Sequence, residues 1–184
     1  MRHPNILDES GAALLVIDLQ DSLLKAIHEH ERVVANSVKL IETAKIFSIP
    51  ILVTLQYAQR LGDVTQAVAD ALPHDTRMDK MTFSCVDGEG FIEALEQTGR
   101  RQVIICGVET HVCVNQTAHD LLARGYSVHI VKDAVSSRTP ANWATGIEKM
   151  RDSGCVITST ETAIFELIRD ASRAEFKKIL PLIK

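Results

Sequence analysis

Short apolar runs alternate with helical patterns along this chain, and this alternation constrains the fold more than any other feature. Runs of about six residues that are apolar throughout predict strands buried on both faces. They lie at 12–17, 51–55, 103–106, 126–131 and 155–158. Between them, apolar side chains recur at helical spacing, as at Val34, Val38 and Ile41. This pattern predicts an α/β fold with a parallel sheet covered by helices on both faces.

Length and composition are consistent with one domain over residues 1–184. A chain of 184 residues with 46% hydrophobic residues can bury a two-sided core. We find no internal repeat, low-complexity segment or linker that would divide it. The polar stretch 56–77 predicts a loop with one short helix around 64–71, and a final short helix is expected from about Ala174.

Charge and apolar content exclude several classes of partner. The net charge is −4 and aromatic residues make up 4%, which argues against a nucleic-acid-binding surface. No stretch approaches the roughly 20 apolar residues of a membrane span, and the first residues do not resemble a signal peptide. The four cysteines show no Cys-x-x-Cys spacing, so a disulfide framework is not expected. We therefore predict a cytoplasmic protein with neither a nucleic-acid nor a membrane partner.

The segment from Gly107 to Val114 carries the strongest chemical signal. It follows an apolar strand and opens an amphipathic helix, which places Cys113 in the first helical turn. Unpaired backbone N–H groups and the positive end of the helix dipole converge there. A thiol in that position can have a lowered pKa and act as a nucleophile, and the same N–H groups could stabilise an oxyanion.

Two further residues could act together with this cysteine. Asp18 ends the first strand, so it lies on the same edge of a parallel sheet as Cys113 and could accept the thiol proton. A helix cap or a solvated turn is the simpler interpretation of Asp18. Lys80 would stabilise both charges if its ammonium faced the cleft, although such a lysine is usually a surface residue. Gln20 and His111 are candidate substrate contacts, and a purely local hydrogen-bonding role for His111 is equally compatible with the sequence.

These motifs, taken in order, resemble the isochorismatase-like cysteine hydrolase family. They are Val-Ile-Asp18-Leu-Gln20 at the end of the first strand, Lys80 after a mid-chain loop, and Gly-Val-Glu-Thr-His-Val-Cys113-Val at the start of a helix. The resemblance extends from about Ala12 to Phe165. It implies a Rossmann-like three-layer α/β/α sandwich with a six-stranded parallel sheet and an Asp18–Lys80–Cys113 triad. It also implies a cis peptide between Val108 and Glu109 that aims the N–H groups of Glu109 and Cys113 at an oxyanion.

Departures from the family pattern narrow the chemistry. Nicotinamidases of the family hold a metal with an Asp-x-His motif, whereas the corresponding Thr54-Leu55-Gln56-Tyr57-Ala58 has neither residue. We therefore expect no metal and no cofactor. Members that cleave isochorismate, a vinyl ether, usually lack the nucleophilic cysteine that this chain retains.

The resulting hypothesis is a small-molecule hydrolase whose substrate is an amide, carbamoyl or related C–N carbonyl compound and which forms a thioester at Cys113. One alternative is vinyl ether hydrolysis with Asp18 as the acid. Another is a non-catalytic or redox-responsive protein in which Cys113 is oxidised. Family members generally associate, and the apolar stretch from Ile179 to Ile183 would suit a contact, so we expect a homo-oligomer.

Overall fold

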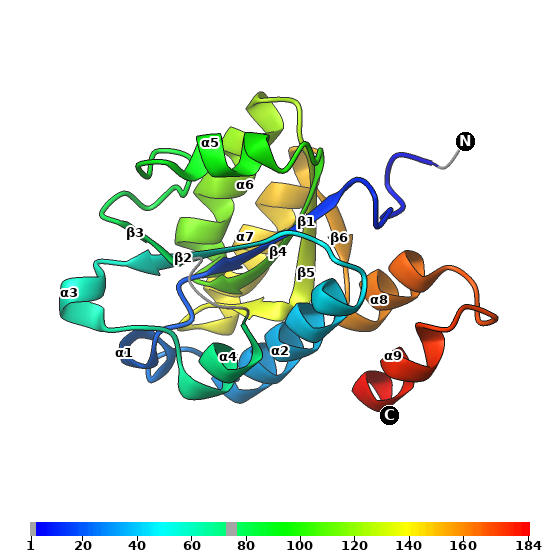
Figure 1. Cartoon of the computed structure of the whole chain (residues 1–184). Coiled ribbons are helices and arrows are strands. Elements are labelled where there is room, and N and C mark those ends of the chain that lie inside the picture. Colours follow the sequence, from blue (N-terminus) through cyan, green and yellow to red (C-terminus); the bar gives the residue numbers. More distant parts are fainter. Residues whose placement is uncertain (1–2, 73–76) are drawn as a thin grey trace.

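A six-stranded parallel sheet forms the centre of the molecule, as the computed structural model shows for residues 3–72 and 77–184 (Figure 1). The strands lie in the order β3-β2-β1-β4-β5-β6, and every neighbouring pair runs parallel. Their bounds are β1 Ala12–Ile17, β2 Ile51–Gln56, β3 Arg77–Lys80, β4 Gln102–Val108, β5 Ser127–Ser136 and β6 Val156–Thr158. The predicted fold class is confirmed.

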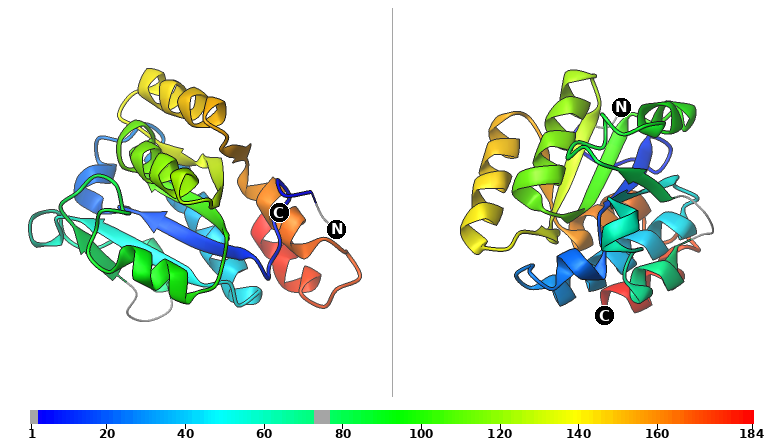
Figure 2. Two further views of the ribbon diagram at one scale, coloured as in Figure 1. Left: turned by 90° about the horizontal axis from the view of Figure 1, so that it is seen from above. Right: turned by 90° about the vertical axis from the view of Figure 1, so that its left-hand side faces the viewer.

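Helices cover both faces of this sheet (Figure 2). One layer contains α1 (Asp21–Leu24), α2 (His30–Ile46), α4 (Gln66–Ala71) and α8 (Thr160–Ile168), with α9 (Phe176–Ile183) packed outside α8. The other layer contains α5 (Phe91–Gln97), α6 (Asn115–Ala123) and α7 (Pro140–Asp152). A short helix, α3 (Ala58–Leu61), follows β2, and a π-helical turn, η1 (Thr110–Val114), precedes α6.

Strand β1 shows why the sheet strands are apolar throughout. Alternate side chains of a strand point to opposite faces, and both faces of this sheet are covered. Leu14 and Val16 pack into the core under α2, whereas Leu15 and Ile17 pack into the core under α6. All four side chains are at most 1% exposed, so a polar residue at any of these positions would be buried in the core.

The structure differs from the sequence prediction at two strands. The residues 77–80 were expected in or just after a loop, but they form edge strand β3, whose hydrogen-bonded partner is β2. Its sequence, Arg-Met-Asp-Lys, lacks an apolar run because an edge strand is only partly buried. Strand β5 continues five residues beyond the predicted end at Val131, and its last residues pair with Gly107 and Val108 after a register shift in β4. Residues 73–76 of the predicted loop lie outside the described residues.

The apolar C-terminal stretch is partly used within the chain. Ile179 of α9 is fully buried against Ile164 and Ile168 of α8, so it is not available for a contact between subunits. Over the described parts of the chain, no helix is both long enough and apolar enough to cross a bilayer.

Candidate active site

Asp18, Lys80 and Cys113 meet at the carboxyl edge of the sheet. Asp18 follows β1, Lys80 ends β3 and Cys113 lies in η1 after β4, so parallel strand direction brings all three to one edge. The Lys80 Nζ atom lies 2.7 Å from Asp18 Oδ2 and 3.8 Å from Cys113 Sγ. The three residues are 0%, 4% and 7% exposed, respectively. They form a compact, nearly dry cluster of a carboxylate, an ammonium and a thiol.

The turn after β1 aims the Asp18 side chain. Asp18 has a φ of 53°, in the left-handed region that aspartate tolerates better than most residues. Its backbone N–H donates to the Thr54 carbonyl, and its own carbonyl accepts from Gln20 N–H at 2.8 Å. These bonds hold the chain in a sharp reversal directly after the strand, so the carboxylate points along the edge toward Lys80.

Two glycines allow the Cys113 segment to pack closely. At Gly107, which has a φ of 120°, a Cβ atom would lie 2.0 Å from the Ile17 carbonyl oxygen. At Gly146 of α7, a Cβ atom would lie 3.0 Å from the backbone oxygen of Thr110. Close approach on both sides therefore positions η1 against the end of β1, where Asp18 lies.

Backbone geometry between β4 and α6 is unusual. The peptide bond between Val108 and Glu109 is cis, and residues 110–114 form a π-helical turn. Single π-helical turns occur frequently at functional sites. The Glu109 carbonyl accepts from Val112 N–H and from Val114 N–H, which leaves Cys113 between these two bonded residues at the start of the helix.

Electrostatics favour a charged lysine. Burial by itself lowers the pKa of Lys80, but the negative charge of Asp18 and its hydrogen bond to the ammonium act in the opposite direction, and the net pKa is raised. Lys80 is therefore an ammonium at neutral pH, and it donates to Asp18 Oδ2, to Gln56 Oε1 at 2.6 Å and to the Thr82 carbonyl at 3.3 Å.

Cys113 differs from the expectation of an acidic thiol. Burial, followed by the negative charge of Asp18, raises the pKa of Cys113 to about 12, and the opposing effect of Lys80 is smaller. The resting residue is therefore a thiol. For the sulfur to act as a nucleophile, a base would have to remove this proton, and the neighbouring carboxylate is that of Asp18.

Gln20 and His111, the expected substrate contacts, bond to the protein itself. The Gln20 Nε2 atom donates to the carbonyls of Gln56 and Gly62, and its Oε1 atom accepts from Gln56 N–H. Gln20 is fully buried and ties the end of β1 to the end of β2. His111 Nδ1 lies 3.0 Å from the Ser137 hydroxyl, which matches the local hydrogen-bonding alternative.

Sequence reasoning missed three residues around the triad. Gln56 ends β2 and accepts from Lys80, while Thr54 of the same strand donates to Asp18 Oδ1 at 2.8 Å. The Cys85 sulfur lies 3.6 Å from the Thr54 hydroxyl. The edge rule that selected Asp18 applies equally to polar residues at the end of β2, so Thr54 and Gln56 could have been found from the sequence.

Cation-binding residues are not assembled anywhere in the described ranges, 3–72 and 77–184: no group of three His, Cys, Asp or Glu side chains is placed to hold a metal ion. Gln56 ends β2, within the stretch 54–58 that contains neither Asp nor His, and its amide oxygen contacts the Lys80 ammonium.

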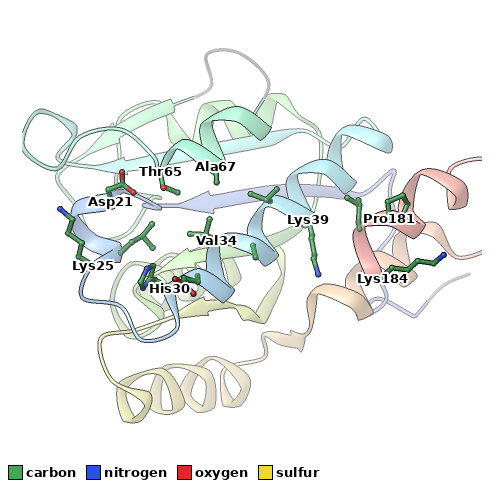
Figure 3. A pocket seen from close by; sticks show the side chains of 14 residues that line it. Asp21, Lys25, His30, Val34, Lys39, Thr65, Ala67, Pro181 and Lys184 are labelled. Atoms are coloured by element: carbon green, nitrogen blue, oxygen red, sulfur yellow. The ribbon is translucent and has the colours of Figure 1, made fainter.

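A separate hollow of about 770 Å³ lies along the outer face of α2, bounded by α1, α4 and α9 (Figure 3). Its walls combine apolar side chains such as Val34 and Val38 with the lysines Lys25 and Lys39. None of the three triad residues lines it. The candidate triad therefore lies at the sheet edge, apart from this groove.

Comparison with known proteins places the chain. The family model described as the isochorismatase domain matches residues 12–162. A relative from Phytophthora sojae, the secreted isochorismatase effector Isc1, is 41% identical over 180 residues, covering 95% of this chain and 85% of its own length.

Solved structures agree with this assignment. The MAR1 ribonuclease of Caenorhabditis elegans is 35% identical with a TM-score of 0.91, over 97% of this chain and 92% of that one. YcaC of Pseudomonas aeruginosa, described with hexane-2,5-diol and covalent acrylamide, is 26% identical with a TM-score of 0.91 over 99% and 93%. YcaC of Escherichia coli, described as an octameric hydrolase of unknown specificity, has the same identity and TM-score over 99% and 91%. The chain belongs to the isochorismatase family.

Proposed function

We propose that this isochorismatase-family protein hydrolyses a C–N bond in a small amide, carbamoyl or related carbonyl compound, with Cys113 as the nucleophile. The observation that carries the proposal is the Lys80 ammonium, which lies 2.7 Å from the Asp18 carboxylate and 3.8 Å from the Cys113 sulfur. A nucleophile, a base and a fixed cation within one buried cluster are the groups that thioester chemistry needs.

In the first half-reaction, Asp18 removes the Cys113 proton as the sulfur attacks the carbonyl carbon. This order fits a thiol whose pKa is raised to about 12, because the proton leaves only when a base accepts it. The carbonyl oxygen becomes an oxyanion, for which the N–H groups of Glu109 and Cys113 are the proposed donors. The C–N bond then breaks, and Asp18 returns the proton to the departing nitrogen.

In the second half-reaction, water attacks the thioester and Asp18 accepts one of its protons. The C–S bond breaks, the acid product leaves, and Asp18 reprotonates the Cys113 sulfur, which restores the resting enzyme. Lys80 stays charged throughout and stabilises the carboxylate and the developing thiolate. Gln20 and Gln56 hold the strand ends that carry these groups.

One related structure supports a nucleophile that small amides can reach. YcaC of Pseudomonas aeruginosa is described with covalent acrylamide, a small amide that nucleophiles attack at its alkene carbon. A ribonuclease activity, as in the name of the Caenorhabditis elegans neighbour, is not favoured here because the chain carries a net charge of −4.

The test is a mass-spectrometric screen of amides, hydroxamates and carbamoyl compounds, followed by variants on the substrate found. Cys113→Ala and Asp18→Asn should each lower kcat by at least about a hundredfold, the range of nucleophile and general-base removal. Cys155→Ala is the matched control, since Cys155 is also a buried free thiol but lies outside the triad. Turnover that survives both triad substitutions would exclude the mechanism.

Vinyl ether hydrolysis is the second candidate, favoured by the name of the relative that is 41% identical, an isochorismatase effector. In that reaction Asp18 would protonate the substrate, and Cys113 would have no covalent role. Isochorismate turnover that persists in Cys113→Ser and disappears in Asp18→Asn would select it over the thioester route.

A redox-sensing role is less well supported. Sensor thiols have a low pKa and are accessible, whereas Cys113 is 7% exposed and its pKa is raised.

We further propose that the whole chain, residues 1–184, acts as one domain within a homo-oligomer. Helices α8 and α9 extend past the family match and pack against α2, and the Escherichia coli relative is described as octameric. Light scattering on the purified chain tests the assembly. A cytoplasmic location stays a prediction from the sequence, and it contrasts with the name of the secreted Phytophthora relative.

A further inference from the structure

A threonine and a second cysteine lie behind the Asp18 carboxylate, and the proposed reaction uses neither. The Thr54 hydroxyl is 2.8 Å from Asp18 Oδ1, the oxygen that Lys80 does not contact, and 3.6 Å from the Cys85 sulfur. Thr54 is 1% exposed and Cys85 is fully buried. The Cys85 backbone N–H donates to the Thr117 hydroxyl at 2.9 Å, which fixes the loop that carries this thiol.

The chemistry of these groups sets the direction of the hydrogen bonds. An ionised carboxylate only accepts, so the single Thr54 hydroxyl proton points at Asp18. The Thr54 oxygen is then an acceptor toward Cys85, whose S–H must be the donor. Burial, followed by the charge of Asp18, raises the pKa of Cys85 to about 11, so this thiol keeps its proton at neutral pH. The chain runs from Cys85 through Thr54 to Asp18.

We propose that Thr54, oriented by Cys85, is a positioning residue that holds the Asp18 carboxylate in one orientation for proton transfer from Cys113. The two carboxylate oxygens are then held from opposite sides, Oδ1 by Thr54 and Oδ2 by Lys80. A hydrogen bond to a charged group is stronger than one between neutral groups. Removing the hydroxyl therefore frees Asp18 Oδ1 and lets the carboxylate leave the orientation in which it can accept the Cys113 proton. This inference rests on the proposed role of Asp18.

Three titratable groups act on Asp18 within the described part of the chain. They are Lys80 from β3, Cys113 from η1 and Cys85 from the loop after β3. Lys80 is held by Gln56 and the Thr82 carbonyl as well as by Asp18, so its position does not depend on Thr54. A change at Thr54 thus reports on Asp18 more directly than on the lysine.

The test measures alkylation of Cys113 by iodoacetamide against pH, with peptide mapping to separate this thiol from the other three. Thr54→Val removes the hydroxyl at nearly constant volume, and Thr54→Ser keeps it. In Thr54→Val the alkylation rate of Cys113 should fall roughly tenfold, because one hydrogen bond to the charged Asp18 is lost. Thr54→Ser should stay within about twofold of the parent protein.

Two further variants keep the outcomes distinct. Parent-like profiles in Thr54→Val would overturn the inference, and so would equal slowing in Thr54→Val and Thr54→Ser. If Thr54→Val does not fold by circular dichroism, Cys85→Ala decides, because loss of the donor behind Thr54 should also slow the alkylation of Cys113. An unchanged alkylation rate in Cys85→Ala would then count against the inference. Unchanged alkylation in Asp18→Asn would instead remove the proposed function itself.

Discussion

Gly107 offers a sharp test of how the fold builds the site. An alanine there would place a Cβ atom 2.0 Å from the Ile17 carbonyl oxygen and 2.7 Å from the Ile17 backbone nitrogen. Both neighbours are backbone atoms of β1, paired with β4 along its whole length, so neither can move aside as a flexible side chain would. Strands β1 and β4 would have to separate at the point where Asp18 and the Cys113 segment begin.

The expected loss in the free energy of unfolding has two contributions. A non-glycine residue with positive φ costs about 1–2 kcal/mol, and Gly107 has a φ of 120°. The contact at 2.0 Å would also force two central strands apart. Gly107→Ala is therefore expected among the rare substitutions that lower the free energy of unfolding by more than about 4–5 kcal/mol. That is a large share of the roughly 5–15 kcal/mol that stabilises a domain.

Urea unfolding followed by circular dichroism measures this cost, with Gly125→Ala as the matched control. Gly125 has a φ of 79° and nothing within 4 Å of its Cβ position, so it isolates the backbone contribution. Gly107→Ala should lower the free energy of unfolding by several kcal/mol more than the control, or prevent folding. Equal losses in the two variants would refute the argument from close strand approach.

Two other predictions concern charge. Lys80→Met should lower the free energy of unfolding by about 3–5 kcal/mol, because it leaves the buried Asp18 carboxylate without its cation. Adding Asp18→Asn to that variant should recover much of the loss in urea titrations, and no recovery would mean that the lost charge pairing is not the cause. Burial lowers the pKa of His129 from 6.5 to about 4, so the unfolded chain binds more protons between these values and stability falls as pH decreases through this window. Between pH 7 and about pH 4.5 the parent should lose about 2–3 kcal/mol more than His129→Gln in paired urea titrations, and parallel losses would contradict this assignment.

Much of the fold could be predicted from local pattern. The apolar runs marked β1 and β2 almost to their ends, because a strand buried on both faces needs an apolar residue at every position. Helical spacing likewise marked α2. Strand β3 was not predicted, because Arg77–Lys80 has no apolar run and is a strand only through its hydrogen bonds to β2. The full length of β5 depended on pairing with β4 in the same way.

For the site, the order of elements determined which side chains share an edge. Parallel strands bring their carboxyl ends together, so the positions of Asp18 and Cys113 at strand ends were enough to predict that they lie on one side of the sheet. The family resemblance contributed the cis peptide and the place of Lys80 in a triad. The roles of Gln20 and His111 could not be predicted in this way, because their hydrogen-bond partners are distant in the sequence and come close only on folding.

The sequence by itself thus determined the architecture and identified the candidate catalytic residues, because periodicity and strand direction are local properties. Tertiary packing alone decided their chemical state. Burial beside Asp18 raises the pKa of Cys113 and keeps the thiol protonated, although Lys80 and the start of the helix favour the thiolate. Thr54, Gln56 and Cys85 become neighbours of the triad only on folding. Desolvation and Coulomb interactions depend on distances through space, which spacing along a chain does not encode.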